Sequence, residues 1–186
     1  MNKLLITIFM VLLATSVFAQ SPMIGLYADE AGTVRFAGIE PYVAPLVLYA
    51  IASWPIDHPD LAAGITAVEF KFDNLPENEG YPIGTVDIEN ASDLLIGDFW
   101  TDYSLAFSEP QGAGLGFFSF STLEFMSFDV TWIPEGHLVT TTIGDDCECM
   151  VLVDSVFEIH DAVGETFYFS AVAAETSTWS QVKNLY

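Results

Sequence analysis

The chain has 186 residues, of which 26 are acidic and four are basic, with a formal net charge of −22 and 52% hydrophobic residues. So few cations exclude nucleic-acid binding, because affinity for phosphates depends on Lys and Arg, and they disfavour anionic membrane surfaces. The high apolar and aromatic content excludes a disordered chain and predicts a folded core.

Residues 1–19 have the pattern of a secretory signal peptide. Lys3 precedes an apolar run from Leu4 to Leu13, and Val17-Phe18-Ala19 resembles a small-x-small cleavage site. The run is too short for a membrane-spanning helix, which needs about 20 apolar residues. We therefore expect an exported protein, secreted or held at the cell surface, with no membrane insertion in its mature form.

The first strands are expected soon after the cleavage site. Met23–Ala28 is predicted to be a strand, and Tyr42–Ser53 is apolar almost throughout, which is typical of a strand buried on both faces. Pro45 lies within the second segment. A proline there indicates an edge position, a bulge or a strand that changes sheet.

Ile65–Asp73 shows the clearest alternation of apolar and polar residues. Val68, Phe70 and Phe72 point to one side, which predicts a half-buried strand. Similar short rows follow at Val86 and Ile88, Phe118 and Phe120, Phe128 with Val130 and Trp132, and Phe167 with Phe169. His137–Ile143 and Met150–Val153 are also strand-like.

Helix is expected at only two places. Asn90–Leu95 is predicted to form one helical turn. Thr176–Tyr186 is predicted to form a short C-terminal helical tail, because Trp179, Val182 and Tyr186 recur at helical spacing.

Eight to ten short strands separated by Gly, Pro, Asn and Asp predict an all-β fold, an antiparallel β-sandwich or a barrel. We favour the β-sandwich. It is expected to occupy residues 20–175 as one domain, with residues 176–186 as the helical tail.

The segment from Gly64 to Pro76, GITAVEFKFDNLP, resembles a strand of cohesin-like and related immunoglobulin-like sandwiches. Met23–Asp29 and Thr178–Tyr186 resemble the two ends of uncharacterised exported bacterial proteins. Together these stretches cover about a third of the chain. The resemblance implies a sandwich fold and an exported bacterial origin, and it carries over no ligand.

Cys147 and Cys149 are the only cysteines, and export favours their oxidation. On an extended strand, residues two apart have Cα atoms about 6.6 Å apart, which is near the upper limit for a disulfide. A bridge between them requires a local bend, which the preceding Gly144 could allow. A structural bridge is favoured over a redox role, because the surrounding acids raise a thiol pKa.

Two acid-rich loops are candidates for structural calcium, because calcium binds six to eight oxygen ligands from flexible loops. The candidate ligands are Asp73, Glu77 and Glu79 in the first loop and Asp87 and Asp93 in the second. Neither loop has the spacing of an EF-hand, so solvated surface acids are the alternative. No other cofactor is expected.

Trp100 and Tyr103 lie in a loop-like segment next to Asp98 and Asp102. An aromatic platform beside carboxylates suits stacking on sugar rings, so these two residues are the candidate ligand-binding residues. Packing in the core is the alternative, because it accounts for most aromatic residues in a small sandwich.

No catalytic residues are assigned. The chain has three histidines, His58, His137 and His160, and no Gly-x-Ser-x-Gly motif. We therefore expect a non-catalytic secreted or cell-surface module, binding or structural, whose partner is a protein or a carbohydrate. An outer-membrane β-barrel and a secreted hydrolase with paired carboxylates are the alternatives.

Overall fold

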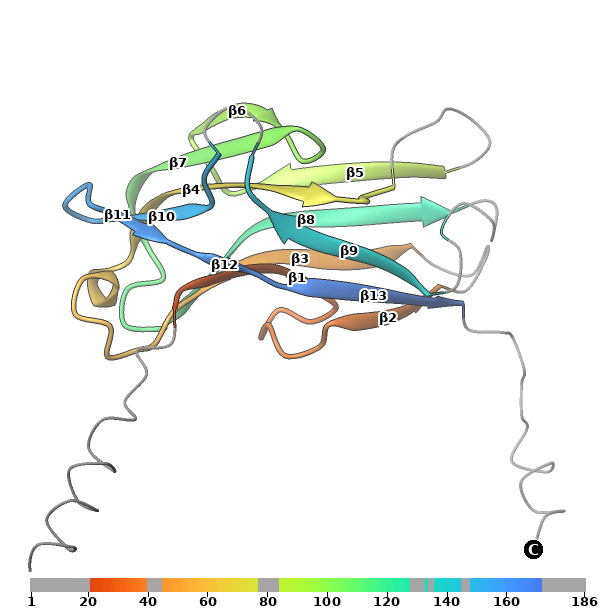
Figure 1. Ribbon diagram of the computed structural model, residues 1–186, viewed down its shortest axis with the longest axis horizontal. Coiled ribbons are helices and arrows are strands. Elements are labelled where there is room, and N and C mark those ends of the chain that lie inside the picture. The colour runs from red at the N-terminus through yellow and green to blue at the C-terminus, as the bar shows by residue number, and fades with distance from the viewer. Residues whose placement is uncertain are drawn as a thin grey trace, which may run out of the picture.

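A computed structural model describes residues 21–39, 45–76, 84–127, 133, 136–144 and 148–171. These residues form strands and one short 3-10 helix, η1 (Leu61–Ala63), as Figure 1 shows. The predicted all-β class is confirmed. The predicted signal peptide (1–19) and helical tail (176–186) lie outside the described residues.

The strands of the described residues are short, with two to eleven residues each. In chain order they are β1 (Met23–Tyr27), β2 (Phe36–Ile39), β3 (Leu46–Ser53), β4 (Ile65–Asp73), β5 (Gly84–Asn90), β6 (Leu94–Asp98), β7 (Asp102–Gln111), β8 (Phe117–Ser127), β9 (His137–Thr142), β10 (Val151–Asp154), β11 (Ile159–Asp161), β12 (Val163–Gly164) and β13 (Thr166–Ala171).

The strands form two sheets that pack face to face (Figure 1). The small sheet has the order β12-β1-β3-β8-β5. The large sheet has the order β11-β10-β4-β9-β13-β2, and β7 and β6 extend it from β4. The pairings are antiparallel except for β1 with β12 and β13 with β2. This architecture confirms the predicted antiparallel β-sandwich.

Alternation in β4 directs its large side chains into the space between the sheets. Val68, Phe70 and Phe72 are almost completely buried, as the period of two predicts. The Phe70 ring lies 5.0–5.6 Å from the rings of four neighbours. These neighbours are Phe72, Phe99, Tyr103 and Phe120. Burial of one such side chain stabilises the fold by about 1.5–3 kcal/mol.

The helical turn predicted for Asn90–Leu95 is wrong. Asn90 ends β5 and Leu94 begins β6, which pairs with β7 from Leu94 opposite Ala106 to Asp98 opposite Asp102. The ladder with β7 satisfies the backbone here, and this tertiary pairing outweighs a weak local preference for helix. Pro45 lies immediately before β3, not inside it.

β9 and β10 follow one another along the same edge of β4. Thr142 pairs with Lys71, and Val151 pairs with Glu69, so both strands lie in one line along β4 although residues 143–150 separate them in the sequence. We call residues 143–150, of which the structure describes 143–144 and 148–150, the excursion. It is closed by a hydrogen bond of 3.1 Å from the Gly144 N–H to the Cys149 carbonyl.

Candidate functional site

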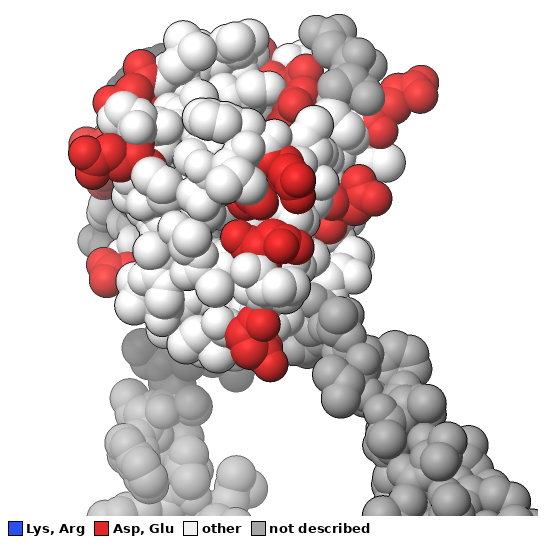
Figure 2. Space-filling view, turned by 90° about the vertical axis from the view of Figure 1, so that its left-hand side faces the viewer, with Lys and Arg blue, Asp and Glu red and all other residues white. Residues whose placement is uncertain are grey.

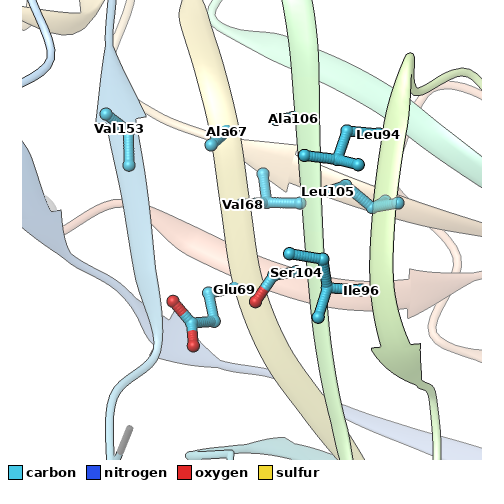
Figure 3. Close-up of a pocket in the computed structure, with 9 residues that line it drawn as sticks. All are labelled: Ala67, Val68, Glu69, Leu94, Ile96, Ser104, Leu105, Ala106 and Val153. Atoms are coloured by element: carbon cyan, nitrogen blue, oxygen red, sulfur yellow. The ribbon is translucent and has the colours of Figure 1, made fainter.

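The outer face of the large sheet carries a line of apolar side chains across five neighbouring strands. The strand registers align Ile159 of β11, Val153 of β10, Ala67 of β4, Ala106 of β7 and Leu94 of β6. We call this line the apolar row. Figure 3 shows four of its members, all but Ile159, side by side on adjacent strands. None of the five contributes to the core between the sheets.

A second line of residues lies beside the apolar row. The same registers align Asp161, Val151, Glu69, Ser104 and Ile96, which we call the mixed row. Figure 3 shows Glu69, Ser104 and Ile96 next to the apolar row. A shallow pocket of about 90 Å³ lies between the two rows. The outer face is therefore slightly concave and mostly apolar.

The ends of the two rows are open to solvent. Leu94 is 55% exposed, Ile96 is 62% exposed and Ile159 is 69% exposed. Scattered exposed apolar residues are normal, but a contiguous exposed patch marks an interaction surface. The apolar row and the neighbouring part of the mixed row form such a patch.

Glu69 is the acid at the centre of this face. Burial and the nearby Asp102 carboxylate raise its pKa, while a hydrogen bond with Ser104 acts in the opposite direction. Because an ionised carboxylate is disfavoured in an apolar setting next to another negative charge, Glu69 opposes folding when it is ionised. A cationic group placed next to Glu69 would reduce this free-energy cost of its ionised form.

Gly144, near the start of the excursion, borders the outer face at Asp102. A Cβ atom added at Gly144 would clash with the Asp102 carboxylate, so the backbone at Gly144 lies directly against β7. Cys149, near the end of the excursion, is disulfide-bonded. Cys147 lies outside the described residues, so the placement of the predicted Cys147–Cys149 bridge stays a prediction.

Acidic groups surround the patch. Asp93 and Asp98 flank the apolar part of β6, and hydrogen bonds from Ser108 lower the pKa of Asp93. Among the described residues the cations are Arg35, which pairs with Glu165, and Lys71, which lies 3.6 Å from Asp73. Figure 2, which views the β11 end of the sandwich, shows Asp and Glu over this end and no Lys or Arg.

The aromatic platform predicted at Trp100 and Tyr103 does not form. Tyr103 is 2% exposed and stacks on Phe99, and its hydroxyl donates to Asn90 Oδ1 at 2.5 Å. Burial raises the pKa of Tyr103 to about 12. Alternation along β7 turns this residue inward, so the prediction of a surface ring is wrong for Tyr103. Trp100 is half-buried, and its indole N–H points to the Pro76 carbonyl at 3.4 Å.

The acids predicted to bind calcium are distributed over different elements. Asp73 accepts a hydrogen bond from Thr142, Asp93 accepts one from the Ser108 N–H, and Asp87 is an exposed residue of β5. Within the described part of the chain, no three His, Cys, Asp or Glu residues form a group that could hold a metal ion. Glu77 and Glu79 lie outside the described residues, so the calcium site stays a prediction.

Asp154 and His160 organise the turn between β10 and β11. Asp154 is 1% exposed; its Oδ1 accepts the N–H groups of Val156 and Glu158, and its Oδ2 lies 3.0 Å from His160 Nε2. Burial alone raises the pKa of Asp154, but these hydrogen bonds hold it below its ordinary value. The Thr66 hydroxyl donates a hydrogen bond to the backbone carbonyl of Asp154. Together these hydrogen bonds stabilise the turn between β10 and β11.

Sequence reasoning missed the residues of the outer face. Tyr103, Leu105 and Phe107 alternate with Ser104 and Ala106, so the period of two in β7 was a usable signal. The Leu94–Ile96 run offered no such signal, because three consecutive apolar residues have no readable period. No described helix is both long and apolar enough to cross a bilayer.

No family model matches the chain, and no curated protein matches it either. Solved structures of cohesin modules show similarity at low identity, and three of them are described here. The third cohesin of ScaC from Acetivibrio cellulolyticus, solved with a dockerin, is 15% identical (81% of this chain and 99% of that chain covered, TM-score 0.44). CaCohA2 from Clostridium acetobutylicum is 14% identical (85% and 96%, TM-score 0.41). The cohesin module of a Clostridium perfringens family 33 glycoside hydrolase is 7% identical (81% and 96%, TM-score 0.43).

These neighbours belong to the class that residues 64–76 resemble in sequence. Their TM-scores lie below 0.5, so they carry no inference about a ligand or a partner. The resemblance of the two chain ends to exported bacterial proteins has no counterpart among the sequence comparisons.

Proposed function

We propose that this chain is an exported, non-catalytic binding module that recognises a protein partner through the outer face of its large sheet. The observation that carries the proposal is the apolar row. Five strands place apolar side chains in line, none of these five side chains belongs to the core between the sheets, and the row ends at well-exposed residues on both sides.

The chemistry of the face defines the partner. A slightly concave apolar surface with an acidic rim suits a protein surface that presents apolar side chains surrounded by Lys or Arg. Glu69 adds a negative charge at the centre, where a cation of the partner would also remove the cost of the ionised carboxylate.

One pair of variants tests the proposal. Ala106→Arg places a long cation in the middle of the apolar row, and Leu115→Arg makes the equivalent change at an exposed residue outside this face. The processed protein and both variants are immobilised and incubated with secreted and surface proteins of the source organism. We expect one protein to be retained by wild type and by Leu115→Arg, with at least tenfold less retained by Ala106→Arg.

Equal retention by all three proteins would contradict the proposal. Circular dichroism and thermal melting of the variants provide the control for folding, since Ala106 faces outward and its replacement is expected to leave the core intact.

A carbohydrate ligand is a second candidate, at a different place from the one predicted. A broad hollow lies on the outer face of the small sheet, lined by Glu30, Tyr49, Phe117, Ser119 and Thr122 together with Ala31. Two aromatic side chains next to hydroxyls and a carboxylate suit the mixed apolar and polar surface of a sugar. Retention on a polysaccharide that is lost in Tyr49→Ala and kept in Ala106→Arg would favour this function.

A further inference from the structure

The outer edge of β6 differs from other strand edges of the sandwich. β6 pairs with β7 on one side and, among the described strands, is the last on that side of the large sheet. Leu94, Leu95 and Ile96 are all exposed, at 44–62%, and no charged residue interrupts them. Its backbone N–H and C=O groups on the open side are available for another strand.

Most other edges in the described residues carry features that discourage pairing. β5 bears Asp87 and Glu89, and β11 and β12 have only three and two residues. β2, at the opposite edge of the large sheet, has four residues and no charge. Charges and short length are the usual means by which proteins protect sheet edges from further strands. β6 has five residues, and its one charge, Asp98, lies at its end, after the apolar residues. Unlike the edge of β2, the edge of β6 adjoins the apolar row through Leu94, so it is the edge placed for strand addition beside the patch.

A second copy of this chain does not fit the edge. Two identical edges related by a twofold axis pair antiparallel. Such a pair brings Asp93 and Asp98 of both copies into the same short interface, and no Lys or Arg lies on β6. The whole chain carries a net charge of −22, so two copies repel one another. The charges favour a cationic partner.

We propose that β6 receives an extended segment of the partner protein as an additional strand of the large sheet, with Lys or Arg at both ends of the segment beside Asp93 and Asp98. This inference rests on the proposed function and specifies how the partner binds. Main-chain hydrogen bonds to β6 provide affinity, and alternate side chains of the added strand continue the apolar row beyond Leu94.

The test uses short peptides and the processed, ¹⁵N-labelled protein. The first peptide is Lys-Val-Thr-Val-Thr-Lys with blocked ends, in which the two cations have the same sequence separation as Asp93 and Asp98. Two further versions are N-methylated, one at both Val residues and one at both Thr residues. Successive N–H groups of a strand point to opposite edges, so only one version loses the donors that face β6.

We expect the unmodified peptide to shift the NMR signals of Leu94–Asp98 and to slow exchange of amides there. One N-methylated version is expected to bind at least tenfold more weakly than the other. Replacement of both Lys by Glu is expected to weaken binding at least tenfold at low salt. Asp93→Asn with Asp98→Asn keeps the side-chain acceptors and is expected to weaken binding severalfold, whereas Asp87→Asn with Glu89→Gln on β5 is expected to change nothing.

Equal binding of the two N-methylated versions would overturn strand addition and leave the docking face intact. Signal changes at another strand, or no binding at millimolar concentration, would overturn it as well. The retention experiment with Ala106→Arg is independent of these results, so failure of the inference and failure of the proposed function are distinguishable.

Discussion

The two faces of β4 and β7 show how one pair of strands serves two purposes. On the inner face, Phe70, Phe72 and Tyr103 fill the space between the sheets with large rings. On the outer face, Ala67 and Ala106 are small and help to form the shallow pocket. The difference teaches that apolar residues alone do not mark a core, because side-chain size and exposure separate the face that fills the core from the face that remains at the surface.

The largest expected effect comes from the inner face. Phe70→Ala removes a ring that contacts four other aromatic rings, so the free energy of unfolding should fall by about 3–5 kcal/mol. Urea denaturation measures this loss. Ala106→Ser on the outer face is the matched control, with an expected change within about 0.5 kcal/mol. An equal decrease in the free energy of unfolding in both variants would contradict the view that only the inner face stabilises the fold.

The second prediction concerns Asp154, a buried carboxylate whose hydrogen bonds compensate for the free-energy cost of its burial. Asp154→Asn is expected to lower the free energy of unfolding by about 2 kcal/mol at neutral pH, because charged hydrogen bonds to the turn and to His160 are weakened. The pKa of Asp154 is lowered in the fold, so its stabilisation is present above the ordinary value of 3.8 and is lost as the pH falls through the lower folded value.

Unfolding of wild type and Asp154→Asn across the acid range measures this dependence. The difference between the two proteins should shrink below pH 3.8. A difference that stays constant with pH would show that the carboxylate charge plays no part.

Glu69 is the contrasting carboxylate, on the outer face. Its raised pKa means that stability is greatest below the ordinary value of 4.5 and falls as the pH rises through the higher folded value. Glu69→Gln is therefore expected to raise the melting temperature at pH 7, by an amount that corresponds to less than about 1 kcal/mol because the site is near solvent. A lower melting temperature at pH 7 would contradict this interpretation.

Calcium has the smallest expected effect. If the acidic loops bind calcium, as the sequence predicts, the melting temperature rises in calcium and stays unchanged in magnesium at equal ionic strength. The same rise in both salts would show only that cations relieve repulsion among the many acids. The double variant Glu77→Gln with Glu79→Gln then shows which loop binds calcium, because loss of the rise in melting temperature would assign the ion to the first loop.

Alternation predicted the fold where one face of a strand is buried. The predicted bounds of Ile65–Asp73 coincide with β4, and Phe167 and Phe169 point inward as expected. The candidate site was less predictable, because it depends on register. Val153, Ala67 and Ala106 are far apart in the sequence, and nothing local to any of them indicates that the strands align them.

The prediction for Tyr103 failed for a related reason. Its acidic neighbours suggested a loop, yet it belongs to β7, where the period of two turns it toward Phe99. A tyrosine can be buried when its hydroxyl finds a partner, here Asn90, and sequence does not reveal such a distant acceptor.

The continuity of β9 and β10 along β4 has a practical consequence. Because the register resumes after the excursion, residues can be added between the two strands without shifting either one against β4. Gly144, at the start of the excursion, also lies against Asp102, next to the patch. A change in the length of this segment is therefore expected to leave the two sheets unchanged, so an engineer is able to graft a foreign epitope there.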